Sequence, residues 1–247
     1  MRLSLVELKR SAKKMINDWQ YLPAVRIHVA ILRRQPEDFE TRLDLADALA
    51  GLGARGPAVA VYRAVAQLCL AGGRPLVALV AMRAARAQGG EVAELERTLA
   101  QLYGRGSSRL ADKGGRLNVA GAEFSVDARE LRKACSVEQL VAEATRVGSE
   151  IATVDALPPR FNRVPILSEL DPATLERLVR SAGLVVHRLP AGQVVMRQGE
   201  PGRSCFLVAR GKLRVVARNR AGEAEELATL ADGAVVGEMA LVSGEPR

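Results

Sequence analysis

Three residues near the C-terminal end of the sequence could bind a small anion together. A glycine at 237 is followed by a carboxylate at 238 and, nine positions after the carboxylate, by Arg247. Gly237 lets the backbone approach a ligand, and a helical turn beginning near Glu238 would point free N–H groups at an anion. Arg247 supplies a permanent charge and a planar fork of donors that suits phosphate oxygens. Because a carboxylate repels phosphate, Glu238 is better placed to accept a hydrogen bond from a sugar hydroxyl. These residues therefore indicate a small nucleotide as the ligand.

This stretch and the residues before it resemble a known protein family. Gly237-Glu-Met-Ala-Leu241 with Pro246-Arg247 is similar to the phosphate-binding cassette of the cyclic nucleotide-binding domain family. That family includes the bacterial catabolite activator and the regulatory subunits of the cyclic-AMP-dependent kinase. The resemblance covers roughly residues 161–247, and further matching segments precede the cassette at 165–178, 189–202 and 205–215.

The resemblance implies cyclic AMP or cyclic GMP as the ligand and a role for each residue of the cassette. Glu238 and the backbone of Gly237 would bind the ribose 2′-hydroxyl, and Arg247 would bind the cyclic phosphate. The amides of Met239 and Ala240 would complete the phosphate cradle.

The sequence departs from the family pattern in two places. Val235-Val236 stand where the family usually has at least one aromatic residue. Family members also continue past the arginine with a small residue, closing strands and a helix over the base. We therefore expect a C-terminally truncated domain, in which the choice between cyclic AMP and cyclic GMP cannot be read from the residues present.

Short apolar segments separated by turn residues predict that β structure positions this site. Several of these segments are rich in valine, and glycine-containing turns separate them, the last turn at 219–222. The expected strands are 184–189, 193–197, 205–210, 213–218 and 225–230. Strands at this spacing predict a C-terminal β jelly roll.

The sequence before the β region has a helical pattern. Alanine-rich segments with apolar residues at helical spacing run from Leu3 to about Tyr103, and Ser4 with Glu7 fits a capping box. One stretch resembles a tetratricopeptide repeat, a helix pair of about 34 residues. Its matching positions are Leu45, Ala46, Leu49, Gly53, Ala58, Tyr62 and Val65. A generic alanine-rich bundle remains the alternative, because only one unit matches well. Stacked helices of either kind favour protein contacts over catalysis.

The predicted fold class is α+β with several domains. We expect a tetratricopeptide-like helical region over 1–103, a linker and connector helix over 104–160, and an incomplete cyclic nucleotide-binding domain over 161–247. Glycine, serine and charged residues over 104–116 indicate an exposed linker. A helical stretch from about Asp127 to Ile151 follows, and Pro158-Pro159 ends it.

Charge and hydropathy argue against a nucleic-acid partner and against a membrane span. The chain of 247 residues has 36 basic and 28 acidic side chains, a net charge of +8. The basic residues are not interleaved with stacking aromatic residues and no helix-turn-helix is evident, so we expect no nucleic-acid partner in this chain. The longest uninterrupted apolar run, 75–82, is too short to span a bilayer. We therefore expect a cytoplasmic protein without a membrane span.

Metal and nucleophile chemistry also find little support in the sequence. The cysteines are odd in number and widely spaced, at 69, 135 and 205, which indicates neither a disulfide framework nor a metal site. Only two histidines are present, too few for the clustered ligands of a metal-binding jelly roll. Ser204 and Ser243 have no base in a recognisable arrangement, so we expect no enzyme activity.

These features together predict a cyclic-nucleotide-responsive regulatory protein. Ligand binding would shift the preference between two arrangements of the β domain and its flanking helices, and so change a protein–protein contact. Two alternatives stay open: a scaffold protein whose jelly roll binds no nucleotide, and a transcription regulator with a DNA-binding module downstream.

Overall fold

A computed structural model describes residues 2–118, 123–151, 157–218 and 224–247. Contacts divide the chain into two compact units. The first consists of Met1–Arg163 with Leu167–Arg180, and the second of Val164–Ile166 with Ser181–Arg247. We call the first the helical unit and the second the β unit.

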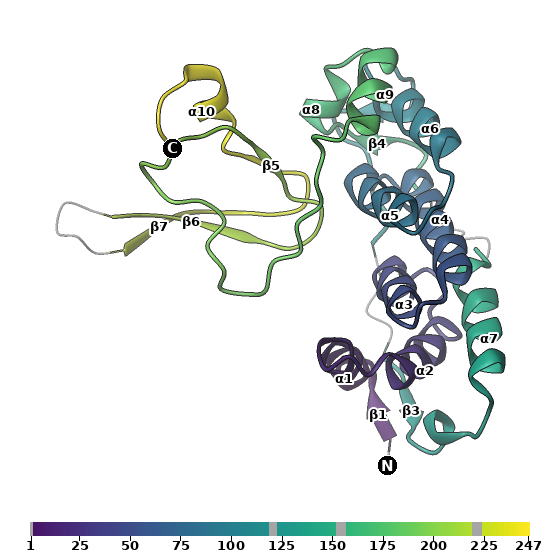
Figure 1. Ribbon diagram of the computed structural model, residues 1–247. Coiled ribbons are helices and arrows are strands. Elements are labelled where there is room, and N and C mark those ends of the chain that lie inside the picture. The colour runs from purple at the N-terminus through teal and green to yellow at the C-terminus, as the bar shows by residue number, and fades with distance from the viewer. Residues whose placement is uncertain (1, 119–122, 152–156, 219–223) are drawn as a thin grey trace. The chain divides into compact units, whose positions relative to one another are not determined.

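Consecutive helices stack in chain order through the first part of the helical unit (Figure 1). They are α1 (Leu5–Asn17), α2 (Tyr21–Leu32), α3 (Phe39–Gly51), α4 (Arg55–Ala71), α5 (Pro75–Ala87) and α6 (Ala93–Tyr103). The predicted capping box at the start of α1 is confirmed, because the Ser4 hydroxyl accepts from the Glu7 N–H and the Glu7 carboxylate accepts from the Ser4 N–H. The starts of α1 and α3, at 5 and 39, and of α2 and α4, at 21 and 55, are each 34 residues apart.

The contact between α3 and α4 contains the positions that the repeat pattern singled out. Leu45, Leu49 and Val65 have no exposed surface, and Tyr62 is 3% exposed. The Tyr62 hydroxyl donates to Asp47 Oδ1 at 2.5 Å. Alanines at 46 and 58, both fully buried, let the two helices approach closely. The helical unit therefore has a packed core of interlocking small and large side chains.

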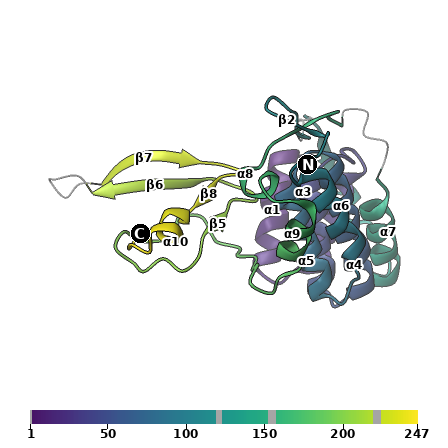
Figure 2. The ribbon, with the colours of Figure 1, turned by 90° about the horizontal axis from the view of Figure 1, so that it is seen from above.

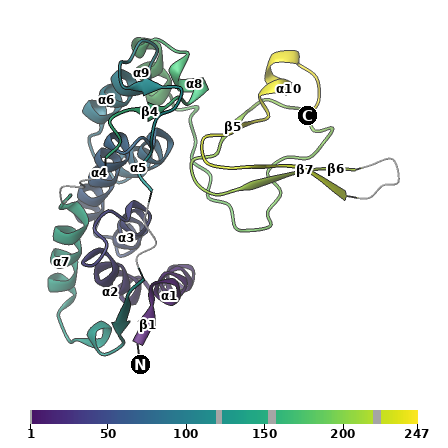
Figure 3. The same ribbon diagram turned by 180° about the vertical axis from the view of Figure 1, so that it is seen from behind.

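A later helix packs across this stack. Strand β1 (Arg2–Ser4) pairs antiparallel with β3 (Ser125–Asp127), and the 3-10 helix η1 (Glu130–Arg132) and α7 (Val137–Ser149) follow. α7 packs against α2, α3 and α4, as Figures 1 and 3 show from opposite sides. The single helical stretch predicted over 127–151 is thus divided into a strand end, a 3-10 turn and a shorter helix.

The segment predicted as an exposed linker is partly packed. Strand β2 (Leu110–Ala111) pairs in parallel with β4 (Phe161–Asn162), and Leu110 is 6% exposed. The Tyr103 ring stacks on Phe161 at 5.1 Å between centroids. Exposure was therefore the wrong prediction for Leu110, since an apolar side chain beside these rings is removed from water.

A short helix, α9 (Pro172–Arg180), packs against α6 through a buried carboxylate. Glu96 is 0% exposed; its carboxylate forms ion pairs with Arg86 at 2.6 Å and with Arg180 at 3.3 Å. Buried carboxylates are retained only when paired in this way. By its contacts, α9 is thus part of the helical unit.

The β unit contains two pairs of antiparallel strands and one short helix. β5 (Phe206–Leu207) pairs with β8 (Val235–Val236), and β6 (Leu213–Arg218) with β7 (Ala224–Leu230), the hairpin seen from above in Figure 2. Helix α10 (Glu238–Ser243) follows β8, and α8 (Pro165–Ser168) lies where the units meet in the sequence.

Strand prediction succeeded only in part of the β unit. β6 has the predicted bounds and β7 begins one residue earlier than predicted, but 184–189 and 193–197 form no strand. The predicted turn at 219–222 lies outside the described residues. The described strands of the β unit form two separate two-stranded sheets, and the closed jelly roll stays a prediction.

Candidate functional site

The predicted ligand-binding residues lie where β8 runs into α10. Gly237 precedes α10 with a φ of 81°, a left-handed conformation that other residues rarely adopt. A Cβ on Gly237 would lie 2.9 Å from Arg247 Nη1 and 2.9 Å from Met196 Sδ. Both the backbone conformation and the available space therefore require glycine at this position.

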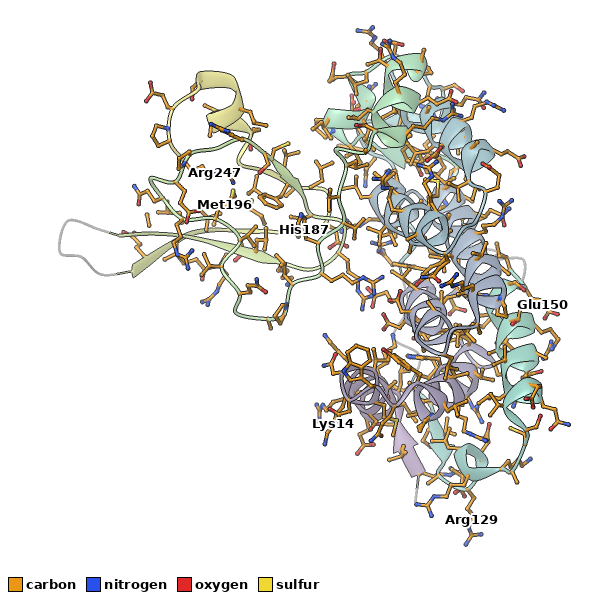
Figure 4. All side chains as sticks on the ribbon, in the orientation of Figure 1. Lys14, Arg129, Glu150, His187, Met196 and Arg247 are labelled. Atoms are coloured by element: carbon orange, nitrogen blue, oxygen red, sulfur yellow. The ribbon has the colours of Figure 1, made fainter. Side chains whose placement is uncertain are left out.

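The guanidinium of Arg247 lies beside Gly237, and Figure 4 shows Arg247 and Met196 close together. Its Nη2 donates to the Ser204 carbonyl oxygen at 2.6 Å and contacts Ser204 Oγ at 3.1 Å. Its Cζ lies 5.8 Å from the centroid of the Phe206 ring. Nη1 is buried and has no hydrogen-bond acceptor among the described residues. One arm of the fork is thus held by the protein, and the other lacks a partner.

The backbone of Arg247 is also held in place. Its N–H donates to the Glu200 carbonyl at 2.9 Å, and its own carbonyl oxygen accepts from the Gly199 N–H at 2.6 Å. These two bonds fix Arg247 to the turn that begins at Gly199. A turn that lies well before Gly237 in the sequence therefore holds Arg247 in place beside this glycine.

The remaining predicted residues belong to the first turn of α10. Glu238 is exposed and Met239 is 70% exposed, whereas Ala240 is 5% exposed. Ala240 contacts Gly202, because a Cβ on Gly202 would lie 2.3 Å from the Ala240 Cβ and 3.2 Å from Arg247 Cγ. The structure thus brings Gly237, Ala240 and Arg247 together. It places Glu238 and Met239 on the exposed start of α10, and their ligand-binding roles stay predictions.

Three neighbours of the arginine were not identified from sequence. Met196, Ser204 and Phe206 all contact Arg247 or the space beside Gly237. Ser204 lies 43 residues before Arg247, and no periodicity relates the two. The only available signal was its place after the glycine turn at 199–202. His187, which is exposed, lies edge-on to Phe206 with 6.0 Å between ring centroids.

This arrangement fits an oxyanion. A buried guanidinium nitrogen without an acceptor is an unsatisfied cationic donor, which a phosphate oxygen would satisfy. Because Gly237 has no side chain, Nη1 lies directly against the backbone of the glycine, at the start of α10. Within the described ranges, no cluster of three or more His, Cys, Asp or Glu side chains could hold a metal ion. In the same ranges, no helix is long and apolar enough to cross a membrane.

Comparison with known proteins places a recognised sequence family on these same residues. Residues 186–247 match the family model of the cyclic nucleotide-binding domain. A cyclic nucleotide-gated potassium channel of Mesorhizobium japonicum is 43% identical to the chain over 84 residues. A cyclic nucleotide-gated potassium channel of Rhizobium etli is 37% identical over 84 residues. The cAMP-dependent protein kinase regulatory subunit of Blastocladiella emersonii is 32% identical over 87 residues.

The similarity to these relatives is confined to part of each protein. The matches cover 34% to 35% of this chain and 21% of each relative. No solved structure matches the chain significantly. A helical region followed by cyclic nucleotide-binding domain sequence at 186–247 is therefore the organisation that the structure and the comparisons support.

Proposed function

We propose that the β unit binds cyclic AMP or cyclic GMP and that the chain is a regulatory protein without enzyme activity. The observation that carries this proposal is the buried Nη1 of Arg247, which has no described acceptor and lies against Gly237. Both residues fall within the segment that matches the cyclic nucleotide-binding domain. A cyclic phosphate is an anion of the size and shape that one arginine arm and nearby amides bind well.

Each residue of the cassette has a role in this proposal. Arg247 Nη1 donates to a phosphate oxygen, and the backbone of Gly237 approaches the ligand because no Cβ intervenes. The amides of Met239 and Ala240, which begin a helix and therefore have no intrahelical acceptor, donate to the same phosphate. The exposed Glu238 carboxylate accepts from the ribose 2′-hydroxyl, where its charge does not face the phosphate.

The helical unit would supply the contact that the ligand regulates. We assign its helices to tetratricopeptide-like repeats because α1 with α2 and α3 with α4 recur at 34 residues and bury the expected positions. Stacked repeats of this kind present an extended surface to a protein partner. The chain passes from α9, packed on α6, directly into the β unit at Ser181. A ligand that binds one conformation of the β unit more tightly can thereby shift the conformation of the chain where α9 joins the β unit.

Isothermal titration calorimetry tests the proposed ligand. Cyclic AMP or cyclic GMP should bind with a measurable heat, whereas adenosine, which lacks the phosphate, should bind far more weakly. Absence of binding by both cyclic nucleotides at millimolar concentration, with the circular dichroism spectrum unchanged, contradicts the proposal and favours a scaffold whose β unit binds no nucleotide.

Replacement of the arginine tests the assigned phosphate contact. Arg247→Ala should weaken cyclic nucleotide binding roughly 30-fold or more, because truncating one member of a desolvated charge pair costs about 2–5 kcal/mol. Arg203→Ala removes an exposed arginine from the adjoining turn and is the matched control; it should leave the affinity nearly unchanged. Equal affinities for Arg247→Ala and the unsubstituted protein would overturn the phosphate assignment.

A further inference from the structure

The turn between Gly199 and Ser204 holds Arg247 in three different ways. Its backbone at Gly199 and Glu200 exchanges two hydrogen bonds with the backbone of Arg247. Its last residue, Ser204, accepts from Nη2 through both the carbonyl and the hydroxyl oxygen. Between these points, Gly202 lies against the arginine side chain. The same short segment therefore fixes the backbone, the stem and the head group of one side chain.

Gly202 makes room for the arginine stem. A Cβ at this position would lie 3.2 Å from both Cγ and Nε of Arg247, closer than most Cβ contacts allow. It would also lie 2.3 Å from the Ala240 Cβ, a distance that real structures do not tolerate. Any larger residue must therefore displace Arg247, α10 or both. The absence of a side chain at 202 sets how closely the arginine and the α10 turn approach each other.

Ser204 sets the direction of the guanidinium. Because Nη2 donates to the serine oxygens, the planar fork cannot rotate freely, and Nη1 is left as the buried arm without a described acceptor. The guanidinium also lies over the Phe206 ring, with 5.8 Å between Cζ and the ring centroid. A long side chain held in one conformation before binding loses less rotational freedom when it takes up a ligand.

We propose that Gly202 and Ser204 are positioning residues that orient the Arg247 guanidinium so that Nη1 meets an incoming phosphate. They act through the arginine and make no required ligand contact of their own. The affinity for the phosphate-containing ligand therefore depends on them, whereas the affinity for the nucleoside part does not. This inference rests on the proposed binding of a cyclic nucleotide at Arg247.

Binding measurements with two probes separate positioning from a general effect on the fold. Ser204→Ala should weaken cyclic AMP binding about fivefold and Gly202→Ala about tenfold or more. The affinity for adenosine, which lacks the phosphate, should be the same in both variants and in the unsubstituted protein. Ser204→Thr keeps a hydroxyl at the same place and should restore most of the affinity. In an Arg247→Lys background, Ser204→Ala should have little further effect, because the planar fork that it orients is gone.

Matched controls are available within the β unit. Ser243→Ala removes an exposed hydroxyl that donates to the Met239 carbonyl and accepts from the Glu245 N–H, and it makes no described hydrogen bond to Arg247. Gly183→Ala adds a methyl group that meets Ser181 Oγ at an ordinary 3.5 Å. Neither should change the affinity for cyclic AMP. If either control weakens binding as much as the variant that it matches, or if adenosine loses affinity in parallel, positioning is overturned.

A measurement without nucleotide keeps the inference testable even if the proposed function fails. Nitrogen-15 relaxation of the Arg247 Nε–H group should show a rigid side chain in the unsubstituted protein and a mobile one in Ser204→Ala and Gly202→Ala. Equal mobility in all forms overturns the positioning role. If the protein binds no cyclic nucleotide but the arginine is rigid and becomes mobile in both variants, the positioning role is supported. Only the identity of the ligand is then overturned.

Discussion

The helical unit buries many more of its apolar side chains than the β unit does. The helical unit buries long apolar residues along every helix from α1 to α6, many with no exposed surface. Among the described residues of the β unit, only Val208, Val236 and Ala240 are buried apolar residues. Eight of its other large apolar side chains are exposed, from 37% to 70%: Val185, Val186, Leu189, Val194, Val216, Leu227, Met239 and Leu241.

This difference indicates that the units are held together by different interactions. The helical unit has the burial that dominates folding free energy, and it adds buried charges that connect distant helices. The β unit depends more on hydrogen bonds, and several of these converge on Arg247. Elements with few buried apolar contacts open locally at low free-energy cost, and binding sites are often found on them. A ligand at Arg247 would therefore stabilise the unit that has fewer buried apolar contacts.

The largest expected effect comes from breaking the buried charge in the helical unit. Arg42 is 0% exposed, and its Nη1 donates to the carbonyls of Val147 and Gly148 at the end of α7, its Nη2 to the Pro36 carbonyl. Arg42→Met keeps an unbranched apolar stem but leaves these carbonyls buried without a donor. We expect a loss of about 3–5 kcal/mol in the free energy of unfolding, measured by urea denaturation followed at 222 nm.

A second arginine that contacts α7, at the C-terminal end of α2, provides the control. Arg33 joins Glu143 of α7 at 2.9 Å, but half of its side chain is exposed. Arg33→Met should cost about 1 kcal/mol or less, because solvent screens an exposed ion pair. If Arg33→Met and Arg42→Met lowered the free energy of unfolding equally, burial of the Arg42 charge would not be what makes it important for stability.

The next effect depends on pH and again tests burial in the helical unit. His28 on α2 is 2% exposed, neither ring nitrogen has a described hydrogen-bond partner, and burial lowers its pKa from 6.5 to about 4. Nearby Asp38 opposes this shift in pKa, and Lys9, paired with Asp38 at 2.6 Å, supports it. The folded state therefore holds His28 neutral at pH values where the unfolded chain binds a proton.

The sign of the pH effect follows from that lowered pKa. Stability from neutral His28 is present above pH 6.5 and is lost as the pH falls towards 4, by an amount on the order of 3 kcal/mol. His28→Leu removes the titration, so the unfolding free energies of the variant and the unsubstituted protein should diverge over this range. Subtracting the two pH profiles cancels the carboxylates that titrate nearby. His187→Leu, at an exposed histidine of the β unit, is the matched control, and a flat difference profile for His28→Leu would contradict the argument.

The helical unit could be predicted largely because its signals are local. Ser4 and Glu7 lie three residues apart, and Leu45 with Leu49 repeats within one helix, so short sequence windows contained the information. Arg42 could not be predicted in the same way. Arginine in a helix usually faces water, and the carbonyls that retain this one lie 105 and 106 residues away.

The β unit was predictable only where a strand has an adjacent partner. β6 and β7 form a hairpin, and the pattern of short segments between turn residues predicted them almost to the residue. The similar pattern at 184–189 failed, because strand formation depends on a neighbouring strand that the pattern does not identify. Gly237 and Arg247 were identified by residue type and spacing, and the structure brings them together. Ser204, Met196 and Phe206 depend on folding that brings separate segments together, which no spacing rule contains.

The smallest expected effect comes from the exposed face of the β hairpin. Val215 pairs with Ala228 and Val216 with Glu226, so Leu227 is the extra residue of a β-bulge, and its side chain is 61% exposed. Leu227→Thr removes apolar surface that is already in contact with water and retains a residue that favours strands. Hydrogen exchange measured by mass spectrometry should therefore show a change below about 0.5 kcal/mol in the opening free energy of β6 and β7. A loss above about 2 kcal/mol in this opening free energy would mean that Leu227 is covered in solution. The hairpin would then not be sparsely packed, and the contrast with the helical unit would no longer hold there.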